Sequence, residues 1–432
     1  MNSSIGQPAS DPARNFRDGR QANIARGSKF NRKSGALLPY AGATASFRAR
    51  RQFINIALHC TGAGEGHAFL VASVPGKEDT ATAARALYAR IADALHDKHM
   101  EIVHERIFGS LSVEAAVLRE RKAALSERHV SAHGPITYVE GNPLWGEGLA
   151  GMIIHAVSSD KADDVWTIMD GDDPCGRGWR RKGSTYLMLQ NIQGGAGSRS
   201  AEVREMFDHA EGILRQNGAS YKDVARTWLY LSEIVDWYPD FNKARSEKYG
   251  EFGIMPGPGD TMLLLPASTG IGADTPSGAA ASMDLLAVVE NEGTTSLVRK
   301  LTNKKQLDAF RYGAAFSRGA VIKEDDVSLI QVSGTAAIDE HGVSLYPCYI
   351  RSQINCTLDK IQTLLGQEGA DLADICAATV FVKRPEFADV FWKIAADRGI
   401  EDFPAVCVVA DVCRKELLFE IDAEAVVRKG SL

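Results

Sequence analysis

The 432-residue chain lacks the residue patterns that mark metal, membrane and nucleic-acid proteins. Its seven cysteines form no CxxC pair and no Cys/His cluster with ligand spacing, so we predict no metal and no other cofactor. No apolar run reaches the roughly 18 residues that a membrane helix requires. The net charge of −6 gives no general attraction to nucleic acid. Several cysteines lie in apolar segments, which favours free thiols in a reducing cytoplasm.

The bulk composition is that of a globular protein, with 45% hydrophobic and 24% charged residues. The chain is too long for a single core, so we expect two or three domains. Residues 1–51 differ from the rest because they are rich in Arg, Ser, Gly and Ala and poor in acids. No apolar segment of a secretory signal follows them. Their low hydrophobicity favours a disordered basic tail, and a transit peptide has a similar composition.

An internal repeat organises the second half of the chain. The segment GASYKDVARTWLYL begins at Gly218, and GADLADICAATVFV begins at Gly369. Each follows a stretch with apolar residues at helical spacing, and Gly218 falls where a helix C-cap belongs. Each repeat continues into a second predicted helix, over residues 238–249 and 386–398. The sequence therefore predicts two units with the same order of helices and strands.

The region before these units shows the same order in a more diverged form. Its predicted elements are strands over 53–60, 101–109 and 151–159 and helices over 81–97 and 113–127. We therefore predict an α+β protein of three tandem units, residues 52–158, 159–295 and 296–432. Each unit is predicted to be an antiparallel-rich sheet with helices on one face.

Six short motifs in the second and third units carry a resemblance to a known family. They are ARTWLYL, YPDFNKARSEKY, LPASTGIGA, RYGAAF, QVSGTAAI and VCRKELLFEID, in that order along the chain. The two later units resemble the YjgF/RidA superfamily, whose units have the chorismate-mutase-like fold. Within this superfamily, roughly residues 180–430 resemble the chorismatases, which cleave chorismate to pyruvate and a cyclic carboxylate.

The resemblance also implies an assembly. Members of the superfamily usually form trimers, with active sites in the clefts between subunits. Three fused units would imitate that trimer within one chain, so we predict a monomeric pseudo-trimer. The implied partner is a small dianion such as chorismate, and neither nucleic acid nor a membrane is expected.

Chorismate is a dianion with an enolpyruvyl ether, and this chemistry limits which residues can bind it. Two cationic clamps are needed, ideally guanidinium groups that grip a carboxylate with two hydrogen bonds. Arg226 and Arg245 match the family's carboxylate-binding segments. The third unit has Ala377 at the repeat position of Arg226, which favours a function for Arg226. The alternative for both arginines is a surface or ion-paired side chain.

The resemblance implies further binding residues. Tyr230 and Tyr312 would offer phenol hydroxyls to the substrate, although tyrosines are also frequent in cores. Thr269 and Gly270 lie in STGIG, which resembles a tight turn whose backbone N–H groups face an anion. A purely structural turn is the alternative for this segment.

Glu420 matches the family's catalytic glutamate and lies in the last apolar strand-like stretch. An acid inside such a strand is costly to bury unless it has a use. If Glu420 is buried, its pKa should rise, as a general acid that protonates the enol ether at neutral pH requires. The alternative is an edge carboxylate that faces water. Imine deaminases of the superfamily need an arginine directly after Pro-Ala, and this chain has Val406 there.

In the family, the residues at two positions correlate with the product that is formed. Gly334 and Cys413 match the subgroup that forms 3-hydroxybenzoate, whereas the hydrolytic subgroup has alanine at both positions. A thiol could assist proton transfer, and a glycine changes the position of the substrate ring. The alternative for Cys413 is a small buried hydrophobic residue. We therefore predict pyruvate and 3-hydroxybenzoate as the products, with Glu420 as the general acid.

Two other functions stay open from the sequence. One is a RidA-like hydrolase of imines or another small carboxylate, with Glu420 as its acid and base. The other is a non-catalytic RidA-like protein that binds a small carboxylate. The chorismatase prediction requires Arg226, Arg245, Tyr312 and Glu420 to converge on one pocket between the second and third units.

Overall fold

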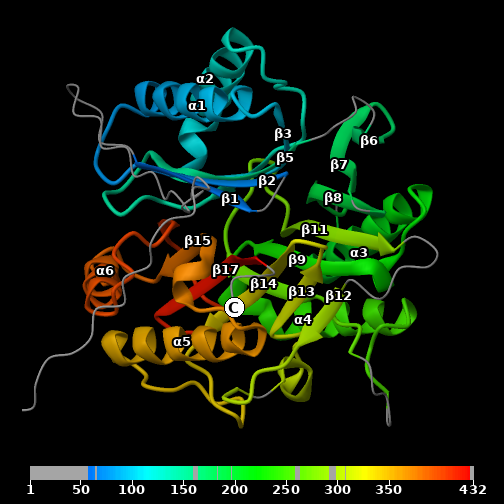
Figure 1. Cartoon of the computed structure of the whole chain (residues 1–432). Coiled ribbons are helices and arrows are strands. Elements are labelled where there is room, and N and C mark those ends of the chain that lie inside the picture. Colours follow the sequence, from blue (N-terminus) through cyan, green and yellow to red (C-terminus); the bar gives the residue numbers. More distant parts are fainter. Residues whose placement is uncertain are drawn as a thin grey trace, which may run out of the picture. The chain divides into compact units, whose positions relative to one another are not determined.

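The structure is a computed structural model, shown in Figure 1. It describes residues 57–63, 66–158, 164–181, 183–195, 197–257, 263–290, 298–306 and 308–428. All of these belong to one compact unit, Gly42–Leu432. The predicted basic tail, residues 1–51, lies outside the described residues. None of the helices in the described ranges is long and apolar enough to cross a membrane.

The first unit is a five-stranded sheet, in the order β1-β2-β5-β3-β4, with two helices. Its elements are β1 (Ala57–Ala63), β2 (His67–Ser73), α1 (Thr80–His96), β3 (Met100–Gly109), α2 (Glu114–Glu127), β4 (Thr137–Glu140) and β5 (Leu149–Ser158). Helix α1 begins after Asp79, whose carboxylate accepts a hydrogen bond from the Thr82 backbone N–H at 2.9 Å. Leu87, Ile91 and Leu95 are buried, as their helical spacing predicts.

The second and third units each contain a six-stranded sheet and two helices. The second consists of β6 (Val165–Asp170), β7 (Asp173–Arg181), β8 (Ser184–Ile192), α3 (Arg199–Gln216), β9 (Val224–Leu231), α4 (Ile234–Glu251), β10 (Ala267–Gly272) and β11 (Ala281–Glu290). The third consists of β12 (Val298–Leu301), β13 (Gly319–Lys323), β14 (Val327–Ala336), α5 (Ile350–Leu365), β15 (Ile375–Val382), α6 (Phe387–Asp397), β16 (Ala405–Val409) and β17 (Phe419–Arg428). The strand orders are β10-β9-β11-β8-β7-β6 and β12-β13-β14-β17-β15-β16. In all three sheets one edge strand, β4, β10 or β16, pairs in parallel with its neighbour, and the other pairs are antiparallel.

The repeated GA(S/D)xxD sequence folds in the same way in both later units. Gly218 and Gly369 have left-handed φ angles of 76° and 72°, which glycine adopts without strain. Ser220 and Asp371 then start a single 3-10 turn with a capping box to the acid three positions on. This turn connects a helix to the fully buried strand β9 or β15. The repeat in the sequence is therefore a repeat of this helix-to-strand connection.

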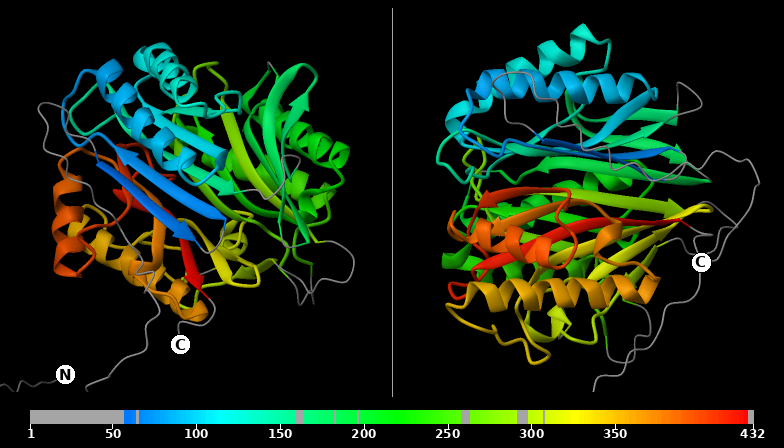
Figure 2. Two further views of the ribbon diagram at one scale, coloured as in Figure 1. Left: turned by 45° about the horizontal axis from the view of Figure 1, so that its top comes forward. Right: turned by 60° about the vertical axis from the view of Figure 1, so that its left-hand side comes forward.

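Apolar residues form one core inside each unit and another between the three sheets. Three clusters fill the space between each sheet and its own helices. The fourth joins residues of all three units, including Phe69, Trp179, Tyr230, Phe381 and Val406. The sheets accordingly face one another, and the helices lie on the faces that point away from the centre (Figures 1 and 2). Side chains of different units therefore meet along these facing strands.

Candidate active site

A small cavity lies between the second and third units. The second unit contributes Tyr238 and Arg245 of α4 and Ser268 and Gly270 of β10. The third unit contributes Gln306, Tyr312, Phe316, Arg318, Gly334, Ala336, Ile338, Cys413, Arg414 and Glu420. The free volume is about 30 Å³, which is room for a water molecule or two and far less than a ligand pocket holds. Side chains therefore close the cavity in this structure.

Glu420 is the second residue of β17, and only 4% of its surface is exposed. Burial raises the pKa of its carboxyl to about 8, and the negative charge of Asp422 adds to this rise. The positive charges of Arg226 and Arg318 act in the opposite direction. The Glu420 carboxyl is therefore protonated at neutral pH and can donate a proton to a ligand in the cavity.

Arg245 brings a buried guanidinium group to the cavity from helix α4, with 1% of the residue exposed. Its Nη2 donates to Asn242 Oδ1 at 2.6 Å, and the guanidinium carbon lies 5.2 Å and 5.5 Å from the ring centres of Phe241 and Phe316. Its Nε has no hydrogen-bond partner among the described residues. Arg245 therefore has a free donor in the part of the second unit that lines the cavity.

Two further arginines of the third unit line the cavity, and the sequence analysis missed both. Arg318 Nη2 donates to the Tyr312 hydroxyl at 2.8 Å. Arg414 Nη1 donates to the Gly342 carbonyl at 2.9 Å and to Ser344 Oγ at 3.1 Å. Arg414 follows Cys413 within the motif VCRKELLFEID, and Arg318 lies two residues beyond RYGAAF. Their position beside matched motifs is the signal that could have identified them.

The charges of this lining suit an anion. Three guanidinium groups, of Arg245, Arg318 and Arg414, face one carboxyl that is neutral at neutral pH. In the described ranges, no group of three or more His, Cys, Asp or Glu side chains could hold a metal ion. The arrangement can therefore bind carboxylates and supply a proton.

Gly334 and Cys413 both lie beside the Glu420 carboxyl. A Cβ atom on Gly334 would lie 2.2 Å from Glu420 Oε1 and 3.2 Å from Thr269 Cγ2, so a larger residue here would push the carboxyl aside. Burial, with a smaller contribution from Glu420, raises the pKa of the Cys413 thiol to about 12. Cys413 is therefore a neutral thiol, which can donate a weak hydrogen bond but does not act as a base at neutral pH.

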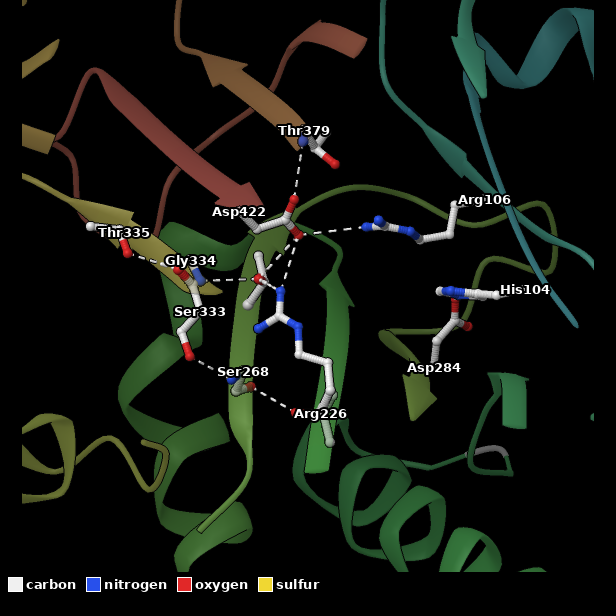
Figure 3. Close-up of polar contacts among 12 residues, drawn as sticks. His104, Arg106, Arg226, Ser268, Asp284, Ser333, Gly334, Thr335, Thr379 and Asp422 are labelled. Carbon is white, nitrogen blue, oxygen red and sulfur yellow. Dashed lines mark hydrogen bonds and ion pairs between the residues drawn. The ribbon is translucent and has the colours of Figure 1, made fainter. Parts of the chain in front are cut away.

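Arg226 and Tyr230 lie outside the cavity, although Arg226 was predicted to grip the substrate. Arg226 Nη2 donates to Thr269 Oγ1 at 2.5 Å and lies 3.3 Å from Asp422 Oδ2 (Figure 3). Thr269 Oγ1 donates to Asp422 at 3.1 Å and accepts from the Gly334 N–H at 3.1 Å. Arg226 is thus an ion-paired residue behind the cavity wall, connected to Gly334 through Thr269.

The same buried pairing occurs at the boundary between the first and second units. His104 Nε2 lies 2.8 Å from Asp284 Oδ2 (Figure 3). Thr137 Oγ1 donates to Asp284 at 2.6 Å. Asp284 and Asp422 are each the fourth residue of the closing strand of their unit. Arg226 therefore belongs to a repeated contact between units, which explains its presence without a bound ligand.

The acid, in contrast, is not repeated. The second-to-last residues of β3, β9 and β15 pair with Gly151 in β5, Ser282 in β11 and Glu420 in β17. A bulge shifts the register of β5, so the residue equivalent to Asp284 and Asp422 in this strand is Ile153. Of these three strands, β17 alone supplies a carboxyl at the position of Glu420.

Known proteins resemble this chain in sequence and in fold. The profile of the Endoribonuclease L-PSP family matches residues 307–427. A chorismatase of Streptomyces hygroscopicus is 25% identical over 323 residues, which are 68% of this chain and 86% of that protein. The crystal structure of a chorismatase superposes with a TM-score of 0.55 at 19% identity and covers 75% of this chain and 93% of that one. The predicted α+β fold of three tandem YjgF/RidA-like units is confirmed.

Proposed function

We propose that the chain belongs to the chorismatase family within the YjgF/RidA superfamily and that it cleaves the enolpyruvyl group of chorismate. The reaction would release pyruvate and leave a cyclic carboxylate. One observation carries the proposal. Glu420, a buried carboxyl that is protonated at neutral pH, faces a cavity lined by three guanidinium groups.

The arginines match the two carboxylates of the substrate. Arg245 comes from the second unit, and Arg318 and Arg414 come from the third, so a bound dianion would bridge the units. Arg318 donates to the Tyr312 hydroxyl, and Arg414 donates to the Gly342 carbonyl and to the Ser344 hydroxyl. Carboxylates form stronger, charge-assisted bonds with guanidinium groups. We therefore expect Arg318, Arg414 and Tyr312 to shift when the substrate enters the cavity.

Glu420 would start the reaction by protonating the terminal methylene carbon of the enol ether. Positive charge then develops on the neighbouring carbon, close to the newly ionised Glu420 carboxylate, which stabilises it. Pyruvate and 3-hydroxybenzoate together contain the same atoms as chorismate, so this branch consumes no water. The ring loses one proton, which balances the proton added to the methylene carbon.

We propose 3-hydroxybenzoate as the cyclic product. Hydrolysis needs a water beside the cationic carbon, whereas the route to 3-hydroxybenzoate consumes none. Gly334 lets the Glu420 carboxyl take its present position, and the neutral Cys413 thiol fills space beside it without removing a proton. One chain supplies both sides of the cavity, which supports a monomeric enzyme.

A second candidate function is a binding protein without catalysis, and the small free volume of the cavity favours it. An imine deaminase has less support. The position of its carboxylate-binding arginine is Val406, which is fully buried in the core between the sheets.

Incubation of the purified full-length chain with chorismate tests the proposal. We expect equal amounts of pyruvate and 3-hydroxybenzoate, separated and identified by liquid chromatography with mass detection. A dihydrodiol acid in place of 3-hydroxybenzoate would contradict the product assignment alone. Binding of chorismate without pyruvate release would favour the second candidate.

A further inference from the structure

Gln306 is a buried residue of the cavity wall whose side chain has no hydrogen-bond partner among the described residues. It lies between β12 and the 3-10 turn Ala309–Tyr312 and has 4% of its surface exposed. Both amide atoms, Oε1 and Nε2, are buried without a hydrogen bond to any described residue. Leaving such groups unpaired is unfavourable, so native structures seldom do it without a reason.

The backbone of Gln306 is held in place. Its N–H donates to the Asn303 carbonyl at 3.0 Å, and Asn303 Nδ2 donates to the Lys360 carbonyl of α5 at 2.9 Å. The residue is thus anchored to the third unit while its amide group lines the same cavity as Arg245, whose Nε is also unpaired. Two buried residues from different units therefore line one cavity and carry unpaired polar atoms.

The chemistry of the amide identifies the substrate group that fits it. Oε1 can only accept a hydrogen bond, and Nε2 can only donate. A substrate dianion with ionised carboxylates offers acceptors to Nε2, but its ring hydroxyl is its only donor for Oε1. A hydroxyl can also accept from Nε2, so it satisfies either orientation of the amide.

We propose that Gln306 is a substrate-positioning residue that accepts a hydrogen bond from the ring hydroxyl of the bound dianion. This inference rests on the proposed function, because it takes chorismate as the substrate. In the branch that consumes no water, the hydroxyl oxygen bonds to the cationic carbon and gives up its proton. The bond from this oxygen to the ring then breaks as the ring loses the proton on the ether-bearing carbon, which leaves pyruvate and the aromatic acid. A hydrogen bond from the hydroxyl to Gln306 fixes the direction in which the oxygen lone pairs point. Gln306 then selects substrates with a hydroxyl at this ring position.

Binding constants test the inference without interference from turnover. In a Glu420→Gln background, titration calorimetry compares chorismate with its analogue that lacks the ring hydroxyl. We expect Gln306→Met, which keeps the side-chain length, to weaken chorismate binding about 10-fold and to change binding of the analogue less than about 2-fold. The matched control is Gln331→Met, since Gln331 also has a buried unpaired Oε1 but does not line the cavity.

The outcomes separate the two proposals. Equal weakening of both ligands by Gln306→Met, or no weakening of either, would overturn the role of Gln306. The proposed function is judged separately, from pyruvate release by the unmodified chain. If chorismate bound neither to the Glu420→Gln variant nor to its Gln306→Met derivative, the role of Gln306 would fall, and pyruvate release by the unmodified chain would still decide the proposed function.

Discussion

Replacing Glu420 by Gln should abolish turnover and, at alkaline pH, stabilise the fold. The carboxyl has an ordinary pKa of 4.5 and a pKa of about 8 in the folded chain. Between these values the folded chain holds one proton more than the unfolded chain, so the free energy of unfolding falls as the pH rises from about 4.5 to about 8. Glutamine does not ionise, so the variant does not lose unfolding free energy in this way as the pH rises. Over the full pH interval between the two pKa values, the free energy of unfolding falls by at most about 5 kcal/mol. Relaxation around the buried charge reduces the expected fall to about 2 kcal/mol.

Urea unfolding at pH 5.5 and at pH 9 measures the effect. We expect the stability advantage of Glu420→Gln over the unmodified chain to grow by about 1.5 kcal/mol between these pH values, which cover most of the interval between the two pKa values. Glu424→Gln is the matched control, because burial raises the pKa of Glu424 to about 7 at a position outside the cavity. The stability advantage of Glu424→Gln over the unmodified chain should grow less between pH 5.5 and pH 9, and this variant should still turn over substrate. A difference between Glu420→Gln and the unmodified chain that is the same at both pH values would refute the assignment of Glu420 as a buried, protonated acid.

Three further substitutions probe the other parts of the site. Arg245→Ala should raise KM about 100-fold with a smaller change in kcat, because it removes a charge-assisted bond to a carboxylate; an unchanged KM in the pyruvate assay would contradict this. Gly334→Ala places a methyl group 2.2 Å from Glu420 Oε1, so kcat should fall at least about 10-fold while thermal unfolding changes little; a normal kcat would show that the carboxyl moves aside freely. Arg226→Ala leaves Asp422 buried without this partner and should lower the free energy of unfolding in urea by about 3–5 kcal/mol. The double variant with Asp422→Ala should recover part of this loss. Loss of chorismate binding at full stability would instead restore Arg226 as a substrate clamp.

The sequence predicts the architecture well because the pattern that it repeats is local. A helix, a glycine in the left-handed region, a capped 3-10 turn and a buried strand follow one another within 33 residues in both later units, over 199–231 and 350–382. Each of these steps has its own residue preference. Strand β2, in contrast, has no counterpart among the predicted strands, because residues 67–73 are buried and carry no alternation of polar and apolar side chains.

The cavity could be predicted only in part. Arg245, Tyr312 and Glu420 do converge between the second and third units. Arg226 was the plausible second clamp because its repeat partner is alanine, but the reason for that asymmetry is a buried ion pair with Asp422. This contact joins strands that are far apart in the sequence, and no local pattern reveals it.

The remaining cationic groups depend on tertiary structure in the same way. Arg318 and Arg414 are separated by about a hundred residues, and their side chains meet at the ring of Tyr312, with both guanidinium carbons 5.5 Å from its centre. Gln306 lies in a connection with no regular pattern. Its importance comes from the burial of an unpaired amide, which only a structure shows.

The rate of pyruvate release from chorismate as a function of pH tests the central claim most directly. If the protonated Glu420 carboxyl starts the reaction, the unmodified chain should release pyruvate at neutral pH, and kcat should fall as the pH rises through about 8. Glu420→Gln should release none at any pH. Absence of pyruvate from the unmodified chain, or a kcat that rises through pH 8, would contradict the account.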